Sequence, residues 1–201
     1  PISIVKRSGN SDSLLGLFSF NFAPRGQYTI IVKGKGTSEE VVLLDELNGS
    51  TEAISAPNPI NSREAHIKVI NFSSEPIQIN KMPGEIISDG LIPNFIDNYS
   101  KVSACGSVDK DTIGVFAGGT LRAQTDMSIE VLEKYTIAVF DSAQRKASRV
   151  VKAEPIFLGE QLGNRAVIRV INGDYLLPGI TVSAGAREIS DARGEDLQRG
   201  F

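Results

Sequence analysis

"REAHIKVINFSSEPIQIN", residues 63–80, returns in altered form as "NRAVIRVINGDYLLPGITVS" at residues 164–183. Apolar and polar residues alternate in both segments, and both contain the triplet Val-Ile-Asn at the same place. A period of two is typical of a β-strand with one face in a hydrophobic core. The repeat therefore predicts two copies of one β-module, the second of which begins near residue 164.

The rest of the chain has the same character. Short apolar runs such as "QYTIIVK" (27–33) and "YTIAVF" (135–140) are rich in Ile, Val, Thr and Tyr, the residues that favour strands. Glycine and proline clusters such as "MPGE" (82–85) and "AGGT" (117–120) separate these runs and predict hairpin turns. This pattern predicts an all-β protein built of antiparallel, immunoglobulin-like β-sandwich modules.

The alternation also predicts which side chains fill the core. Residues 127–134 and 195–201 are the segments with some helical pattern, and each is long enough for only a turn or two. Eight apolar residues at alternating strand positions are expected to point inward: Ile67, Val69, Ile77, Ile79, Ile113, Val115, Ile137 and Val139.

Two proline-containing segments, residues 55–59 and 152–155, predict the domain boundaries, because proline cannot join a central strand ladder. They divide the chain into residues 1–58, 59–155 and 156–201. The middle piece has the usual size of a complete sandwich module. The last piece begins with the repeated opening strand and resembles a front half, whereas the first resembles a back half. We expect 156–201 to complete 1–58, either within one chain or in a neighbouring subunit.

Three segments resemble a known family: "FSFNFAPRGQYTIIVKG" (18–34), "HIKVINFSSEPIQI" (66–79) and "AVIRVINGDYLLPGITV" (166–182). They are similar to a tandem β-sandwich module of secreted bacterial proteins, mostly known as a domain of unknown function and related to the alginate O-acetylation accessory protein AlgF. The resemblance implies an exported, non-catalytic accessory or scaffolding protein of the periplasm or cell surface. It implies partners in an envelope or polysaccharide-modification complex, and possible contact with the polysaccharide itself.

The order of the pieces differs from that family, since a back half precedes the full module and a front half follows it. This order favours an alternative function, a structural protomer of a cell-surface layer or extracellular filament. Identical subunits would then assemble by strand complementation, because a half module exposes unpaired strand edges.

The composition argues against several classes of protein. A net charge of −3 and a pI near 5.3 do not fit a nucleic-acid binder, whose surface would be basic. The sequence has no apolar run of the roughly 20 residues that a membrane helix requires. Neither nucleic acid nor a membrane span is therefore expected.

Residues with catalytic chemistry are scarce. His66 is the only histidine and Cys105 the only cysteine, so the chain has neither an intrachain disulfide nor a cluster of His and Cys for zinc. His66 is expected to be a structural residue of its strand, and Cys105 a small buried side chain. The "DKD" triplet at 109–111 lacks the glycine and distal glutamate of a calcium loop, and a solvated hairpin tip is expected there. No enzyme activity, cofactor or metal is predicted.

Four aromatic residues near turns are the candidate contacts for a glycan or a protein partner: Phe72, Phe95, Tyr99 and Tyr175. Aromatic rings at the edge of a sandwich can stack on sugars or pack against a partner. The alternative, that these rings close the open ends of the sandwich, remains open on the sequence.

Overall fold

The structure is a computed structural model of the chain. It describes residues 2–8, 11–18, 26–34, 39–45, 63–104, 110–131, 133–142, 147–153, 167–173, 180–184, 187–192 and 197–200. Every regular element among these residues is a β-strand, which confirms the predicted all-β fold.

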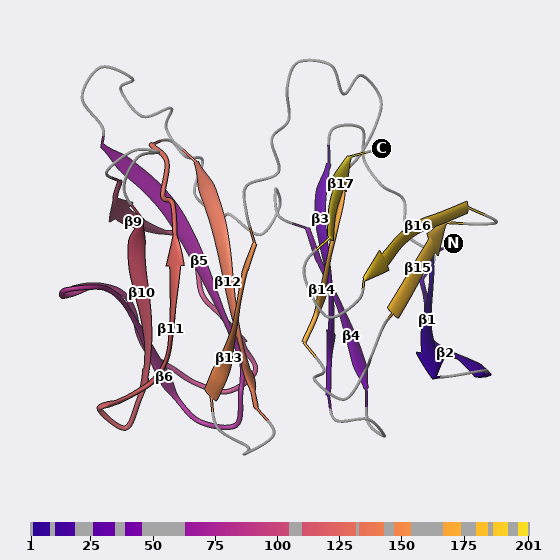
Figure 1. Ribbon diagram of the computed structural model, residues 1–201, viewed down its shortest axis with the longest axis horizontal. Helices are drawn as coiled ribbons and strands as arrows, with labels where there is room; N and C mark the ends of the chain where they lie inside the picture. The colour runs from indigo at the N-terminus through magenta and orange to yellow at the C-terminus, as the bar shows by residue number, and fades with distance from the viewer. Residues whose placement is uncertain are drawn as a thin grey trace. The chain divides into compact units, whose positions relative to one another are not determined.

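The chain divides into two compact units. Pro1–Gly49 and Ile156–Phe201 together form unit 1, and Ser50–Pro155 forms unit 2. In Figure 1 the indigo and yellow ends of the colour scale therefore meet within unit 1, whereas unit 2 contains the intermediate colours. The sequence placed the boundaries after residues 58 and 155.

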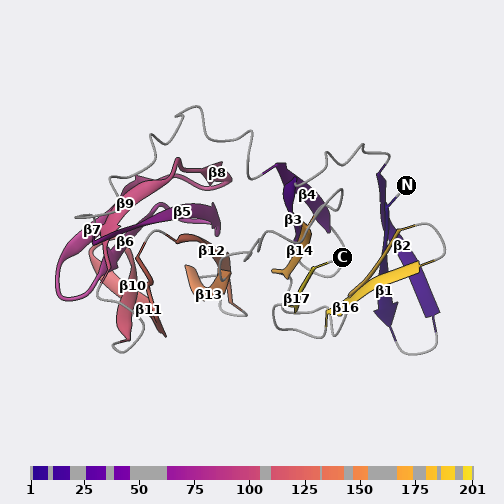
Figure 2. The ribbon, with the colours of Figure 1, turned by 90° about the horizontal axis from the view of Figure 1, so that it is seen from above.

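Unit 2 consists of two sheets that enclose one core (Figure 2). One sheet has the strand order β11-β10-β6-β7, and the other has the order β13-β12-β5-β8, with β9 also paired to β5. The strands are β5 (Glu64–Phe72), β6 (Ile77–Lys81), β7 (Glu85–Leu91), β8 (Phe95–Ile96), β9 (Ser100–Ser103), β10 (Asp111–Ala117), β11 (Thr120–Met127), β12 (Lys134–Asp141) and β13 (Ala147–Ala153).

The two hairpin turns predicted in unit 2 are confirmed. Gly118 and Gly119 connect β10 to β11 with φ angles of 56° and 75°, which glycine adopts without the steric cost of a Cβ atom. Residues 82–84 form the turn between β6 and β7, and the peptide bond between Met82 and Pro83 is cis.

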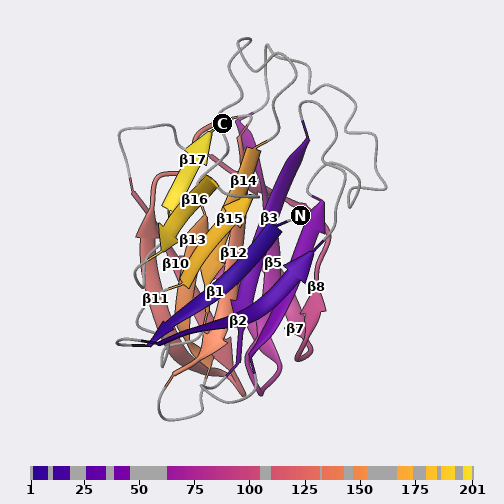
Figure 3. The ribbon, with the colours of Figure 1, turned by 90° about the vertical axis from the view of Figure 1, so that its right-hand side faces the viewer.

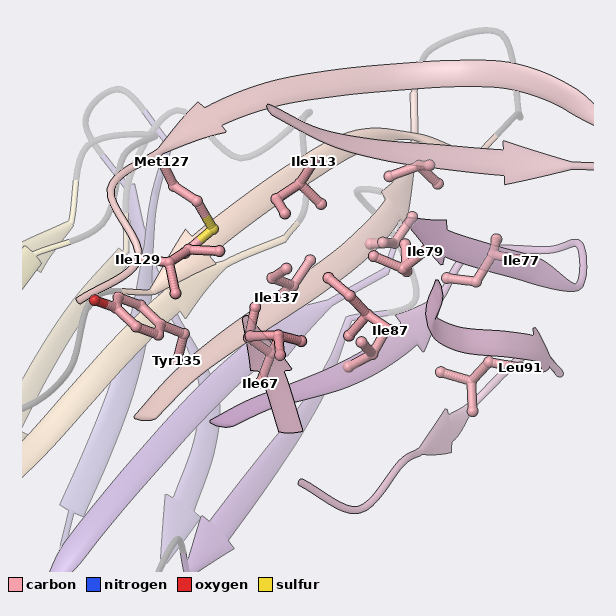
Figure 4. Packing of buried hydrophobic residues seen from close by; sticks show 14 of the residues in the cluster. Ile67, Ile77, Ile79, Ile87, Leu91, Ile113, Met127, Ile129, Tyr135 and Ile137 are labelled. Atoms are coloured by element: carbon pink, nitrogen blue, oxygen red, sulfur yellow. The ribbon is translucent and has the colours of Figure 1, made fainter. Parts of the chain in front are cut away.

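The core of unit 2 is the one that the alternation predicted. Figure 4 shows isoleucines of both sheets pointing toward one another, with Tyr135 and Met127 at one end. Burial of one such side chain contributes roughly 1.5–3 kcal/mol to folding. All eight predicted core residues are 1% exposed or less: Ile67, Val69, Ile77, Ile79, Ile113, Val115, Ile137 and Val139.

Unit 1 is assembled from two distant segments of the chain. Its sheets have the orders β16-β15-β1-β2 and β17-β14-β3-β4. Its strands are β1 (Ile2–Ser8), β2 (Ser11–Phe18), β3 (Gln27–Lys33), β4 (Glu40–Asp45), β14 (Val167–Asn172), β15 (Ile180–Ala184), β16 (Arg187–Ala192) and β17 (Leu197–Gly200). Among the described strands, β1–β15 in one sheet and β3–β14 in the other are the pairs that join the two segments, and we call these two strand pairs the seams. Figure 3 shows the first seam, with β15 and β16 beside β1 and β2.

Apart from β9, which has no counterpart among the described strands of unit 1, the two units have the same topology. In both sheets of unit 1, β14–β17 take the places of β5–β8, and β1–β4 take the places of β10–β13. Corresponding strands even contain a bulge, between Val115 and Phe116 on β10 and between Ile4 and Val5 on β1. Unit 1 is therefore a circular permutation of unit 2.

The register of the central strands repeats as well. Lys68 of β5 lies opposite Thr136 of β12, and Arg169 of β14 lies opposite Thr29 of β3. Both strand pairs are parallel, whereas every other described pair is antiparallel. The sequence did not predict this parallel pairing. A parallel pair requires a crossover, and in unit 2 the strands of the other sheet provide it.

Two segments with a weak helical pattern are not helical where the structure describes them. Leu197–Gly200 is strand β17, because its backbone hydrogen bonds are made to β14. Met127 ends strand β11 and Lys134 begins strand β12, so few residues remain between them for a helical turn.

Candidate functional site

The outer face of β5, away from the core, carries polar side chains. Because neighbouring side chains on a strand point to opposite faces, His66 and Lys68 lie on the face opposite Ile67 and Val69. His66 is 8% exposed and Lys68 is 4% exposed. A lysine is rarely buried to this extent without a favourable partner for its charge.

The neighbouring strands bring further basic residues to this face. Lys134 of β12 and Lys101 of β9 lie directly opposite His66, one on each side. Tyr99 immediately precedes β9, beside the position of Lys68. We call His66, Lys68, Tyr99, Lys101 and Lys134 the Tyr99 site.

The ring of Tyr99 attracts two ammonium groups. Nζ of Lys68 lies 4.5 Å from the centroid of the ring, and Nζ of Lys134 lies 5.2 Å from it. Both distances are within the range of a cation–π interaction, in which the negative face of the ring stabilises the cation. The site therefore combines an aromatic surface with two fixed positive charges.

Asp97 holds the segment that carries Tyr99. The backbone N–H of Asp97 donates to the carbonyl oxygen of Val69 over 2.8 Å. Its carboxylate accepts from Oγ of Ser88 over 2.7 Å and from the backbone N–H of Asn98 over 2.8 Å. These contacts connect the segment just before Tyr99 to both β5 and β7. They therefore restrict the position of the Tyr99 ring.

The charged groups of the site act on the titration of His66. Burial lowers the pKa of His66, and the positive charges of Lys134 and Lys101 lower it further, although Glu64 opposes them. His66 is therefore neutral at pH 7. Glu64 forms an ion pair with Lys101 over 3.5 Å, but the side chains are 46% and 69% exposed, so solvent screens the pair. The described contacts thus bring the ammonium groups of Lys68 and Lys134 to the ring of Tyr99, with the Lys101–Glu64 ion pair beside them.

A second polar cluster lies at the end of β6. Nζ of Lys81 forms a buried ion pair with Oδ1 of Asp111 over 2.9 Å, and it donates to the carbonyl oxygen of Ser103 over 2.6 Å. The carboxylate of Glu85 accepts from the backbone N–H and from Oγ of Ser103. Burial raises the pKa of Glu85, but the hydrogen bonds from Ser103 and the charge of Lys81 lower it by more. The cluster therefore ties the ends of β6, β7, β9 and β10 together.

Asp111 corrects an expectation from the sequence. The triplet at 109–111 was expected to be a solvated hairpin tip, but Asp111 begins β10 and is buried against Lys81. The ammonium group of Lys81 enters the end of the sandwich, where a charge requires an opposite charge nearby. Lys81 belongs to a strand that is distant in the sequence, so residues 109–111 alone could not predict this ion pair.

The four aromatic candidates have different surroundings. Tyr99 lies in the basic site, whereas the ring of Phe72 packs against Phe140 with centroids 5.8 Å apart. Phe95 is 53% exposed on β8, opposite Asn71 in the strand pair. Tyr175 and Cys105 lie outside the described residues.

Sequence reasoning missed Lys68 and Lys134 as site residues. The signal that could have found Lys68 is the repeat itself, because Arg169 is the basic residue at the same place in the second copy. Nothing in the sequence near Lys134 predicts that it lies beside Tyr99, since the pairing of β5 with β12 brings them together.

Comparisons of the chain with family models, with curated proteins and with solved structures gave no match. In the part of the chain that the structure describes, no helix is long and apolar enough to cross a membrane. The same described residues contain no group of three or more His, Cys, Asp or Glu side chains placed to hold a metal ion.

Proposed function

We propose that this protein is a non-catalytic accessory or scaffolding protein that binds an acidic polysaccharide through the Tyr99 site. The observation that carries the proposal is the ring of Tyr99 with the ammonium groups of Lys68 and Lys134 within 4.5 Å and 5.2 Å of its centroid.

A uronic acid residue offers the chemistry that this site would recognise. The apolar face of the sugar ring can pack on an aromatic ring, and its carboxylate can accept charge-assisted hydrogen bonds from ammonium groups. Lys101, whose side chain is 69% exposed, lies at the open side of the site and can contact the next sugar of the chain. Such binding weakens as salt increases, because part of its free energy is electrostatic.

We place this activity in the periplasm or at the cell surface, where the protein assists O-acetylation of an alginate-like exopolysaccharide together with other envelope proteins. The support for this placement is the resemblance of residues 18–34, 66–79 and 166–182 to exported accessory modules. The Tyr99 site fits this role, because it would bind the polysaccharide without reacting with it.

Isothermal titration with an oligomannuronate and with a neutral oligosaccharide of equal length tests the proposal. The acidic ligand should bind more tightly, and Tyr99→Ala and Lys134→Ala should each weaken binding by roughly tenfold, the equivalent of about 1.4 kcal/mol. Leu121→Ala and Lys110→Ala are matched controls, because both residues are exposed in unit 2 and lie outside the site. Equal affinity for the two ligands, or unchanged affinity in Tyr99→Ala, would contradict the proposal.

A further inference from the structure

The seams of unit 1 separate two halves that no turn connects. The half that carries β1–β4 and the half that carries β14–β17 are joined along the chain only through Ser50–Pro155, the whole of unit 2. In unit 2 the corresponding halves follow each other directly, from Ala104 to Asp111. Unit 1 can therefore open along its seams while every hairpin within each half stays closed.

An opened unit 1 would expose much of its core. Tyr28 and Ile30 on β3 are 2% exposed, and Val170 on β14 is 1% exposed. Opening would place these side chains in water and leave β1, β3, β14 and β15 with unpaired edges. Bare central strands of this kind pair with any available strand of matching pattern.

At the seam β3 pairs with β14, with a register from Val167 opposite Gln27 to Asn172 opposite Val32. Two hydrogen bonds at this seam add specificity. Nε of Arg169 donates to Oγ1 of Thr29 over 3.1 Å, and the backbone N–H of Gly173 donates to the carbonyl oxygen of Val32 over 2.7 Å. A second copy of the chain carries the same β14 and can supply the same contacts.

We infer that two copies of this chain exchange residues 156–201, so that β14–β17 of each copy complete β1–β4 of the other. The exchange preserves all contacts within unit 1, and the symmetry closes the assembly as a dimer. Closure within one chain competes with it, because the tethered half has a high effective concentration. The dimer should therefore increase with protein concentration and should form only after unit 1 has opened.

Disulfide capture between two variants tests the exchange. Ser3 and Ser183 lie opposite each other at the β1–β15 seam. One variant carries Ser3→Cys and the other Ser183→Cys, both with Cys105→Ala to remove the natural thiol. The variants are mixed, held at high concentration in mild denaturant, returned to buffer and oxidised. The exchange predicts a covalent dimer that contains both variants. Ser190→Cys in place of Ser183→Cys is the control: Ser190 lies opposite Val182 on β15 and not opposite Ser3, so this dimer should not form.

A locked single chain provides the second measurement. A variant with both Ser3→Cys and Ser183→Cys should form its disulfide internally and, after the same treatment, should remain monomeric in light scattering while the unlocked chain dimerises. Dimers of the locked variant in the same yield as the unlocked chain would overturn the inference. Failure of the mixed variants to form more covalent dimer than the Ser190→Cys control would also overturn it.

Discussion

Nε of Arg169 on β14 donates to Oγ1 of Thr29 on β3 over 3.1 Å, although 140 positions separate the two residues in the sequence. Lys68 and Thr136 occupy the corresponding pair in unit 2. All four side chains are buried. In both units, then, a long basic residue on one central strand lies opposite a threonine on the next, although only unit 2 is a continuous stretch of chain.

Arg169→Met should destabilise unit 1 by about 1–3 kcal/mol, because it leaves the buried hydroxyl of Thr29 without this donor. Amide hydrogen exchange should show the loss of protection in β3 and unchanged protection in β12 of unit 2. Thr29→Val combined with Arg169→Met should cost less than the sum of the two single changes. Strict additivity would mean that the two side chains do not interact.

Lys81→Met should destabilise unit 2 by about 3–5 kcal/mol, because it leaves the carboxylate of Asp111 buried without its partner. The double variant Lys81→Met with Asp111→Leu should recover much of this loss in chemical denaturation. Lys101→Met is the matched control, since its ion pair with Glu64 is exposed and should matter little. A loss in Lys81→Met no greater than in Lys101→Met would refute this account of the cluster.

Asn71→Leu should lower the thermal midpoint of unit 2 by several degrees, with a loss of about 2–4 kcal/mol. Nδ2 of Asn71 donates to the carbonyl oxygens of Glu75 and Leu91, and Oδ1 accepts from the N–H and hydroxyl of Ser73. A leucine of similar volume would remove the donor to the carbonyl oxygen of Leu91 and the acceptor for the backbone N–H of Ser73, although Oγ of Ser73 can still donate to the carbonyl oxygen of Glu75 over 3.2 Å. Asn98→Leu, at an exposed position, should have little effect, and equal losses in the two variants would show that the hydrogen bonds are unimportant.

The stability of unit 2 should decrease as the pH falls below about 6.5. Burial, together with the charges of Lys134 and Lys101, lowers the pKa of His66 in the folded state. The unfolded chain therefore takes up a proton at a pH where the folded chain does not, and acid favours unfolding. Denaturant midpoints at about pH 7.5 and about pH 5.5 measure the effect. His66→Gln should show a smaller decrease, and an identical decrease would assign the pH dependence to other groups.

The sequence was sufficient for the features that depend on neighbours along the chain. Alternation identified the core residues from Ile67 to Val139, and glycine at 118 and 119 identified a hairpin turn. Contacts between distant strands were not predictable in this way. The parallel pairing that brings Lys134 to Tyr99, and the burial of Asp111, depend on which strands become neighbours in space. A period of two identifies the face of a strand but not its partner.

The most direct test of the account is an NMR titration of the full-length, ¹⁵N-labelled chain with an oligomannuronate, in which each shifted amide is assigned. The account predicts that the largest shifts cluster at His66, Lys68, Tyr99, Lys101 and Lys134, that they diminish as salt increases, and that they disappear in Tyr99→Ala. No shifts at millimolar ligand, or shifts centred on residues outside this site, would contradict the claim that unit 2 binds acidic polysaccharide there.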